Sequence, residues 1–443
     1  MKRYILSPLL ILMAISFASF YGSAKKMTTA GKIDNLLRWE ETFGFSGSVL
    51  VVKDGKVILS KGYGYANKQL AFQNTPQTAF YIASVSKPIT ALGIMKLVEE
   101  QKINLNDAVT KYFSSVPENK KDITIEMLLT HTSGLDHTYS CDNIADRSEA
   151  VKTILNETPL VASTGAKYKY SGDNYTLLAA IIEIASGETF ENFISKNILQ
   201  PAGINHPAFT GNIQKTKMDD LASPSESSTY KSLKNIEATW GRKGRAGMIL
   251  SVEDLYKLDK AFTANKMFQA NVTKDILSPK INNSARENYG YGFSLSTTTR
   301  NTRVFGHSGD DDGVGHNVDY LDFPDEGVKL FIASNSGMYS GTSWTAVISS
   351  LLQRLLFTPD FNYPADKLYY NEFNSYLSKE IEKLEGVYKN GNTNYHVWLN
   401  NKGQLIVSPV GEVVAETFGY SKSYMEKNQL TKSILEEAGQ QQY

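Results

Sequence analysis

The sequence predicts an α/β protein of the α+β kind, in which one antiparallel sheet is flanked by helices and interrupted by an inserted helical subdomain. Strand-like segments lie at both ends of the main part of the chain, in residues 48–66 and 293–335. Helical segments fill the stretch between them. One of these, within residues 79–98, is apolar on every side, which is typical of a helix buried in the core.

The composition is that of a globular protein with a large core. The chain has 443 residues, of which 41% are hydrophobic and 21% are charged. Lys and Arg together number 46, as do Asp and Glu, so no overall field favours nucleic acid, and we expect no nucleic-acid partner. Cys141 is the only cysteine. It can form no intramolecular disulfide, and we interpret it as structural or incidental.

The first 24 residues have the pattern of a secretory signal peptide. Lys2 and Arg3 precede an apolar run in residues 4–20, and small residues follow at positions 22–24. We therefore expect residues 1–24 to be a signal peptide and the protein to be exported, either periplasmic or secreted. The run is modest in length and holds a proline, so no stable membrane span is expected after signal removal. An uncleaved anchor is the alternative.

The first strands and the flanking helices follow from local patterns. Asp54 and Gly55 separate two strand-like runs in residues 48–52 and 56–59, which predicts a β-hairpin. A short strand is expected at residues 63–66. Ser251, with Asp254 three residues later, predicts a helix N-terminus. The expected helices are residues 33–43, 125–129, 150–155, 175–186 ending at Gly187, 190–198 stopped by Pro201, 252–264 and 344–357.

The later strands and the C-terminal region complete the predicted order. Strands are expected at residues 293–297, 302–306, 317–323 and 328–335. Together with the earlier elements they give a main domain of residues 30–359. The sequence pattern of residues 360–443 differs from that of the main domain and predicts a small α+β appendage without chemistry of its own. It would contain a charged helix at residues 371–384 and a hairpin of residues 395–399 and 405–407.

Ser84 and Lys87 are the strongest candidates for chemistry. Pro88 suits the first turn of a helix, so we expect Ser84 at the helix N-terminus with Lys87 one turn on and on the same face. A neighbouring base and a helix N-terminus are what a weak nucleophile needs. The S-x-x-K pattern is expected about twice by chance in a chain of this length. It recurs outside any buried helix, at Ser23 and Lys26 and at Ser228 and Lys231.

Two further segments hold candidate residues. Tyr170 stands before an apolar helix, where it can act as a base if cationic neighbours lower its pKa, with a plain aromatic core role as the alternative. At His307, Ser308 and Gly309 we expect a strand to end beside glycine, where backbone N–H groups can face an oxyanion. The alternative for His307 is a turn histidine. His131 is expected to be hydrogen-bonded internally in a structural turn, and no metal site is predicted.

Read in order, these segments resemble the serine β-lactamase and penicillin-binding-protein superfamily. The matching motifs are Ser84-x-x-Lys87, the LLTHTSGL stretch of residues 128–135, Tyr170-Ser171 and His307-Ser308-Gly309. The resemblance covers roughly residues 33–357. It is greatest to the branch of class C β-lactamases, D-alanyl-D-alanine carboxypeptidases and related esterases, and it implies a β-lactamase/transpeptidase-like fold.

The resemblance also implies roles for individual residues. Ser84 would become acylated, and Lys87 and Tyr170 would share the proton transfers. The backbone N–H groups of Ser84 and Asp310 would form the oxyanion hole, and His307 would orient the substrate where many relatives have lysine. No metal or organic cofactor is needed.

Two positions depart from the family pattern. Gly172 stands where the family usually has an asparagine that holds substrate and the lysine, so we expect either that Asp173 or Asn174 takes its place or that the activity is altered. The acidic run of residues 310–312 follows Gly309 where relatives commonly begin with glycine. It is interpreted either as a solvated turn or as a group that repels substrate carboxylates.

The function predicted from the sequence is an exported serine hydrolase that forms an acyl-enzyme at Ser84. Its substrate would be a small molecule or peptide, such as a cell-wall peptide, cleaved at an amide, peptide or ester bond. D-alanyl peptidase, esterase and β-lactamase action all stay open, with the first two favoured. The alternative is a catalytically weak penicillin-binding-like module that binds or senses wall peptides. Gly172 favours that alternative.

Overall fold

The computed structural model describes most of the chain between residues 27 and 358, together with three strands further on. The described residues are 27–42, 44–138, 140–211, 221–223, 239–282, 287–311, 313–339, 342–358, 386–390, 393–399 and 405–409. The predicted signal peptide and the predicted helix of residues 371–384 lie outside them. No helix among the described residues is long and apolar enough to cross a membrane.

The main sheet has eight antiparallel strands in the order β2-β1-β13-β12-β11-β10-β9-β8. The predicted hairpin is confirmed, with Asp54 and Gly55 both at positive φ, as a tight two-residue turn requires. Strands from the two ends of the domain meet where β1 pairs with β13. The strands are β1 (Gly47–Lys53), β2 (Lys56–Tyr63), β8 (Ile281–Asn282), β9 (Glu287–Tyr289), β10 (Ser294–Thr297), β11 (Arg303–Asp311), β12 (His316–Phe323) and β13 (Val328–Ser334).

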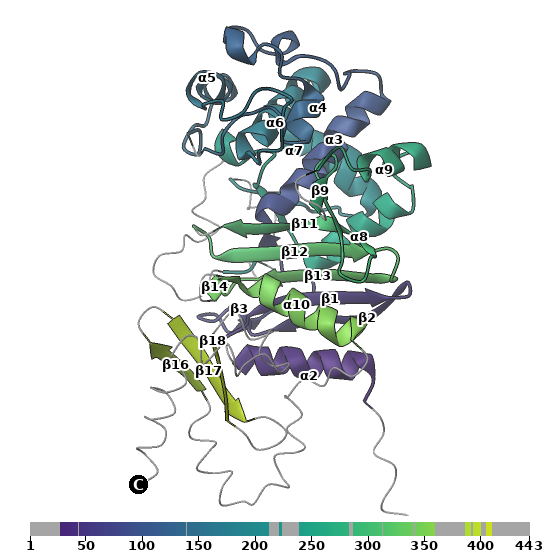
Figure 1. Ribbon diagram of the computed structural model, residues 1–443, viewed down its shortest axis with the longest axis vertical. Helices are drawn as coiled ribbons and strands as arrows, with labels where there is room; N and C mark the ends of the chain where they lie inside the picture. Colours follow the sequence, from purple (N-terminus) through teal and green to yellow (C-terminus); the bar gives the residue numbers. More distant parts are fainter. Residues whose placement is uncertain are drawn as a thin grey trace, which may run out of the picture.

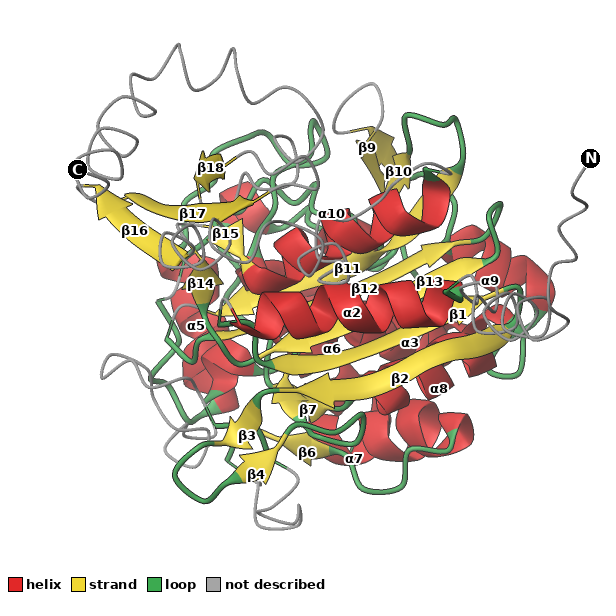
Figure 2. Cartoon of the chain, turned by 90° about the horizontal axis from the view of Figure 1, so that it is seen from below, coloured by secondary structure: helices red, strands yellow, loops and turns green. Residues whose placement is uncertain are grey.

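Helices cover both faces of this sheet, and the larger group forms a separate layer. α2 (Thr29–Thr42) and α10 (Trp344–Phe357) lie across one face, as Figure 2 shows. The other face packs on α3, α8 and the helical subdomain, which stands above the sheet in Figure 1. These helices are α3 (Ser86–Glu99), α4 (Ile125–Leu129), α5 (Arg147–Glu157), α6 (Gly172–Ser186), α7 (Phe190–Ile194), α8 (Val252–Thr263) and α9 (Ala270–Ile276).

Smaller sheets join the remaining segments. A three-stranded sheet links β5 (Phe80–Tyr81), β7 (Met248–Leu250) and β6 (Ala208–Phe209), and so ties the entry of α3 to that of α8. The predicted C-terminal hairpin is confirmed, because β17 (Thr393–Leu399) pairs with β18 (Leu405–Pro409), and β16 (Gly386–Asn390) adds a third strand. Two-stranded pairs are β3 (Tyr65–Asn67) with β4 (Phe72–Gln73), and β14 (Met338–Tyr339) with β15 (Thr342–Ser343).

Helix signals in the sequence predicted most termini well. Ser251 and Asp254 form a reciprocal capping box at the start of α8, and Gly187 ends α6 at positive φ. Two helix predictions were wrong in detail. Ser84 precedes α3 in a short 3₁₀ turn, η1 (Ala83–Val85), instead of opening the α-helix. The helix predicted over residues 190–198 changes to a π-helical turn, Ser195–Leu199, after α7.

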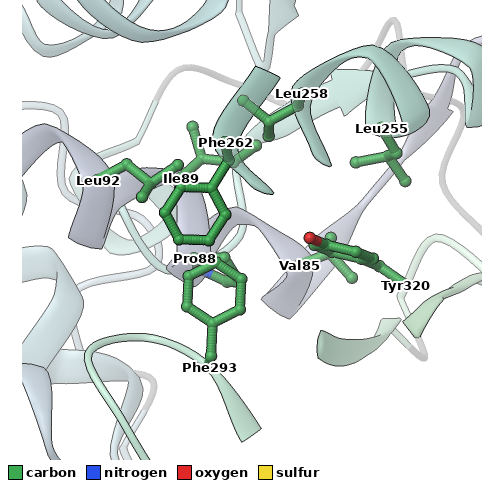
Figure 3. Close-up of a pocket in the computed structure, with 9 residues that line it drawn as sticks. All are labelled: Val85, Pro88, Ile89, Leu92, Leu255, Leu258, Phe262, Phe293 and Tyr320. Carbon is green, nitrogen blue, oxygen red and sulfur yellow. The ribbon is translucent and has the colours of Figure 1, made fainter. Parts of the chain in front are cut away.

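The core beneath α3 is tightly filled. A small apolar cavity of about 10 Å³, about the size of one water molecule, lies between α3, α8 and the sheet. The side chains that line it are drawn in Figure 3. Pro88 and Ile89 line it from α3, and Phe293 and Tyr320 line it from the sheet side. A close-packed interior has low compressibility, so the start of α3 has a rigid base.

Candidate active site

The nucleophile candidate, Ser84, is held in the turn η1 between a strand and a buried helix. Ala83 has φ 45°, a left-handed conformation that costs a residue other than glycine on the order of 1–3 kcal/mol. The surroundings maintain it, because Ile82 donates its backbone N–H to Met248 O in β7 at 3.0 Å and Val85 donates to Ile82 O. Ser84 itself is partly exposed. The strained turn therefore presents one hydroxyl at the surface of a fixed scaffold.

Lys87 lies directly beneath that hydroxyl. The residue is 1% exposed, and its Nζ lies 2.9 Å from Ser84 Oγ and 3.0 Å from the carbonyl oxygen of Arg245. Burial, with the nearby Arg245 charge as a second cause, holds the pKa of Lys87 well below its ordinary value. A lysine amine with a lowered pKa can accept a proton near neutral pH, which an ordinary lysine cannot.

Tyr170 reaches the same hydroxyl from the other side. Its phenolic hydroxyl donates to Ser84 Oγ at 3.0 Å, and its ring lies 4.9 Å from Lys87 Nζ. His131 supports this segment, since its Nδ1 accepts the backbone N–H of Ser171 at 3.1 Å and its ring packs on Tyr170. The interpretation of His131 as an internally bonded structural residue is thus confirmed. Ser84, Lys87 and Tyr170, which are predicted from two separate motifs, are brought together.

His307 lies on β11 and is neutral. Its Nδ1 is 2.6 Å from the carbonyl oxygen of Ser308, which can only accept, so Nδ1 carries the proton. Nε2 then accepts from the hydroxyl of Tyr289 at 3.2 Å. Burial and the Lys87 charge lower the pKa of His307 to about 3. The prediction that a strand ends here was wrong, because β11 runs on to Asp311 and His307 lies within it.

Gly309 lets β11 pass directly against the nucleophile turn. A Cβ at this position would lie 2.4 Å from Ile82 O and 2.9 Å from the backbone nitrogen of Ser84. The backbone of β11 therefore runs beside that of Ser84, and Asp310 is the next residue along it. This arrangement is compatible with an oxyanion hole made by the N–H groups of Ser84 and Asp310, and that assignment stays a prediction.

Comparison with known proteins agrees with this geometry. The family model described as Beta-lactamase matches residues 38–338. The chain belongs to the beta-lactamase family. This family, with its penicillin-binding-protein homologues, is one of serine hydrolases, so the superfamily indicated by the motifs is correct.

Individual relatives support the same assignment. Penicillin-binding protein 4* of Bacillus subtilis (strain 168) is 28% identical over 354 residues, covering 74% of this chain and 77% of that protein. A crystal structure of a penicillin-binding protein from Bacillus halodurans shares the fold with a TM-score of 0.62 at 22% identity, over 72% of this chain and 98% of that one. The crystal structure of D-amino acid amidase from Ochrobactrum anthropi SV3, complexed with D-phenylalanine, shares the fold with a TM-score of 0.60 at 20% identity. The match covers 70% of this chain and 92% of that one.

An open cleft of about 410 Å³ lies in front of Ser84. Among the described residues that line it, Asp310 is the only Asp, Glu, Lys or Arg. Burial lowers the pKa values of the two histidines, which favours their neutral forms. The lining residues are Ser84, His137, Tyr170, Ser294, Ser296, Val304, Phe305, Gly306, His307, Ser308, Asp310 and Leu321.

The acidic run after Gly309 is only partly the solvated turn that was one of its interpretations. Asp310 is exposed at the cleft. Asp311, the last residue of β11, instead pairs with Arg242 at 2.7 Å, and its other oxygen accepts the backbone N–H groups of Gly313 and Val314. Asp311 thus fixes the end of the strand. Asp312 lies outside the described residues.

Two site residues were missed by the motif analysis. His137 lines the cleft, and its Nδ1 accepts the backbone N–H of Gly172 at 2.9 Å. Arg245 lies behind Lys87 and beside Gly172. Neither residue belongs to a motif of chemical significance, and the only sequence signal was the small residue at position 172. Among the described residues, no group of three His, Cys, Asp or Glu side chains could hold a metal ion.

Proposed function

We propose that this protein is an exported serine hydrolase that forms an acyl-enzyme at Ser84 and cleaves an amide, peptide or ester bond. The observation that carries the proposal is the position of one partly exposed hydroxyl between a buried amine at 2.9 Å and a phenol at 3.0 Å. These are the parts of an activated nucleophile with two proton-transfer groups. Membership of the beta-lactamase family supports the same class of reaction.

The groups around Ser84 account for every proton transfer in the proposed reaction. Ser84 Oγ attacks the substrate carbonyl and gives its proton to the neutral amine of Lys87. The backbone N–H groups of Ser84 and Asp310 hold the negative oxygen. The carbonyl re-forms as the bond to the leaving group breaks, and Tyr170 passes a proton to that group, replaced from Lys87. A water molecule then attacks the acyl carbon and gives a proton to Lys87 by way of Tyr170. The bond between the acyl carbon and Ser84 Oγ breaks, and Lys87 returns that proton to Oγ, which regenerates Ser84 and the neutral amine.

The charges around the cleft favour substrates without a carboxylate close to the reacting carbonyl. Neutral His307 stands where many relatives have a lysine, and Asp310 adds a negative charge at the cleft. Among the described residues that line the cleft, a substrate carboxylate would therefore meet no Lys or Arg and one like charge. We propose peptidase, amidase or esterase action on neutral or cationic acyl groups in preference to efficient hydrolysis of β-lactams.

Intact-mass spectrometry of the protein without residues 1–24 tests this function. Wild type and Ser84→Ala are each followed over time with a fluorescent penicillin and with an uncharged activated ester. We expect an adduct of wild type alone, forming faster with the ester than with the penicillin and decaying as product accumulates. If neither probe labels wild type, or Ser84→Ala reacts equally, the nucleophile assignment is wrong.

The same experiment separates the hydrolase from a module that binds or senses wall peptides. In a sensor, the Ser84 adduct would form and persist without product. Gly172 favoured the sensor because it lacks the family's side chain. In the folded protein, however, the side chain of Arg245 occupies the space beside Gly172, which weakens that argument for a sensor. Export is tested by locating the full-length chain and sequencing its N-terminus. Cleavage after residue 24 is expected.

A further inference from the structure

The segment of residues 239–247 packs on the two helices that carry the catalytic candidates. Thr90, which follows Lys87 by three residues in α3, donates its hydroxyl to Gly244 O at 2.7 Å. Gly244 has φ 75°, and a Cβ there would lie 2.2 Å from the carbonyl oxygen of Tyr175 in α6. The backbone at this point therefore has little freedom, and the next residue, Arg245, begins from a fixed position.

Arg245 is buried and anchored at both ends. Its backbone carbonyl accepts from Lys87 Nζ at 3.0 Å. Its guanidinium donates from Nη1 to the carbonyl oxygen of Thr138 at 3.1 Å and pairs through Nη2 with Asp142. The residue as a whole is 5% exposed. One residue thus links the base candidate to the segment of residues 138–142.

The side chain of Arg245 fills the space beside Gly172. A Cβ on Gly172 would lie 2.8 Å from Arg245 Cδ, 2.9 Å from Arg245 Nη1 and 3.2 Å from His137 Cε1. Gly172 opens α6 and does not have the left-handed φ that favours glycine. The requirement for glycine is therefore one of space. An asparagine cannot occupy position 172 while Arg245 keeps this place.

We propose that Arg245 replaces the amide side chain that the family pattern puts at position 172, and that it is a positioning residue which holds Lys87 against Ser84. The inference rests on the proposed function, because the position of Lys87 matters only if Lys87 moves the proton of Ser84. It differs from the family pattern in that the holding group comes from residues 239–247 and acts from behind the lysine, through a carbonyl oxygen and a charge.

The charges around Lys87 give Arg245 a second effect. The groups that face the amine are Ser84, Tyr170, Tyr175, His131, His137, His307 and Arg245. Burial lowers the pKa of Lys87 most, and the Arg245 charge lowers it further. Asp142, which pairs with Arg245, offsets part of that charge. Removing the guanidinium should raise the pKa of Lys87, so that more of the amine is protonated at neutral pH.

A double-variant cycle tests the exchange of side chains. Acylation rates are measured for Gly172→Asn, Arg245→Ala and the double variant. We expect Gly172→Asn alone to lower the rate by about 100-fold, because it pushes the Arg245 side chain away and strains the peptide whose carbonyl oxygen holds Lys87. The double variant should be at least tenfold faster than Gly172→Asn. If the two effects simply multiply, the side chains do not exchange roles and the proposal is wrong.

The pH dependence of acylation supplies a readout that a purely structural role would not move. Arg245→Met keeps the apolar stem and removes the charge. We expect the acid limb of its pH–rate profile to shift upward by about one unit, a tenfold loss on that limb. The double variant Arg245→Met/Asp142→Asn also removes the Asp142 carboxylate, which Arg245→Met alone leaves without its ion-pair partner. Lys243→Met is the matched control, because Lys243 lies two residues away and pairs with Glu183 and Glu191 outside the site.

A direct titration keeps this test separate from that of the proposed function. Lysine labelled with ¹³C at Cε is followed by NMR in Ser84→Ala, with Lys87→Met to assign the signal. The Lys87 titration should move to higher pH when Arg245→Met is added and stay in place with Lys243→Met. An unmoved titration in Arg245→Met overturns the inference even if wild type is an active hydrolase. A moved titration sustains the link between Arg245 and Lys87, and the mass experiment separately decides whether that link serves catalysis.

Discussion

At the scale of single residues, the site depends on a buried lysine that has no carboxylate among its hydrogen-bond partners. Lys87 is almost fully buried and contacts only a hydroxyl and a carbonyl oxygen by hydrogen bonds. Both groups accept from an amine without stabilising a full positive charge as a carboxylate would. The neutral amine is therefore favoured, and the hydroxyl that it can deprotonate lies 2.9 Å away.

Tyr170→Phe tests the second proton-transfer group. The change removes only the hydroxyl that lies 3.0 Å from Ser84 Oγ. We expect acylation and deacylation to slow by about 10²–10⁴, the usual value of general acid–base help. Tyr168→Phe is the control, because Tyr168 packs its ring on His131 and Tyr289 in the same cluster. Equal losses from both changes would mean that Tyr170 acts only through packing.

At the scale of elements, the site is the meeting point of η1, the start of α6 and the strand β11. β11 has to approach η1 closely, and Gly309 is what allows it. Arg242 holds the end of that strand through Asp311 and also bonds to the hydroxyl of Tyr81 in β5 at 2.6 Å. The strand and the turn are thus fastened together beyond the reacting atoms.

Gly309→Ala tests the contact between β11 and η1. The new methyl group meets backbone atoms of Ile82 and Ser84, which cannot move aside as a flexible side chain can. We expect β11 to be pushed away and acylation to fall by about 10²–10³, the value of one oxyanion donor. Gly313→Ala, where the nearest atom is 3.2 Å away on the Asp311 side chain, should change the rate by less than about threefold. A fully active Gly309→Ala protein would contradict the proposed oxyanion hole.

At the scale of the whole molecule, one sheet joins the two ends of the domain and also forms one wall of the site. β1 and β13 pair along seven positions, so residues nearly 300 apart in the chain are locked together. His316 lies in this interior, fully buried, where its Nδ1 accepts the backbone N–H of Tyr81 at 3.1 Å. Burial lowers its pKa to about 3. Folding therefore favours the neutral imidazole.

Because burial favours the neutral form of His316, we expect the protein to lose folding stability in acid. The unfolded chain binds a proton at this histidine below about pH 6.5, whereas the folded protein does not until the pH approaches 3. Its contribution is fully present above pH 6.5 and is lost as the pH falls toward 3. Relative to His316→Asn, wild type should lose about 2–3 kcal/mol of unfolding free energy between pH 7 and pH 4.5. Urea unfolding at both pH values measures this.

The control for this prediction is the exposed His206, and His206→Asn should track wild type at both pH values. Asp319 titrates in the opposite sense, because burial raises its pKa to about 6, but it is present in every variant and cancels in the difference. A constant difference between wild type and His316→Asn would show that folding does not lower the pKa of His316.

Sequence patterns predicted the elements well where the signal was local. The turn at Asp54 and Gly55, the capping box at Ser251 and the end of α6 at Gly187 depend on residues within four positions of each other. The length of β11 was underestimated at its C-terminal end, because its pairing with β12 and the bond from Arg242 extend it past Gly306. Those partners are distant in the chain and leave no local pattern.

The sequence by itself determined the family, the order of elements and the three residues that meet at the candidate site. It did so because turn residues, an apolar helix and ordered motifs are written in short stretches. Only the tertiary structure decided the chemical state of the site. The neutral imidazole of His307, the lowered pKa of Lys87 and the place of Arg245 against Gly172 all depend on burial and on long-range contact. Charge in a protein is set by what surrounds it, and the surroundings exist only after folding.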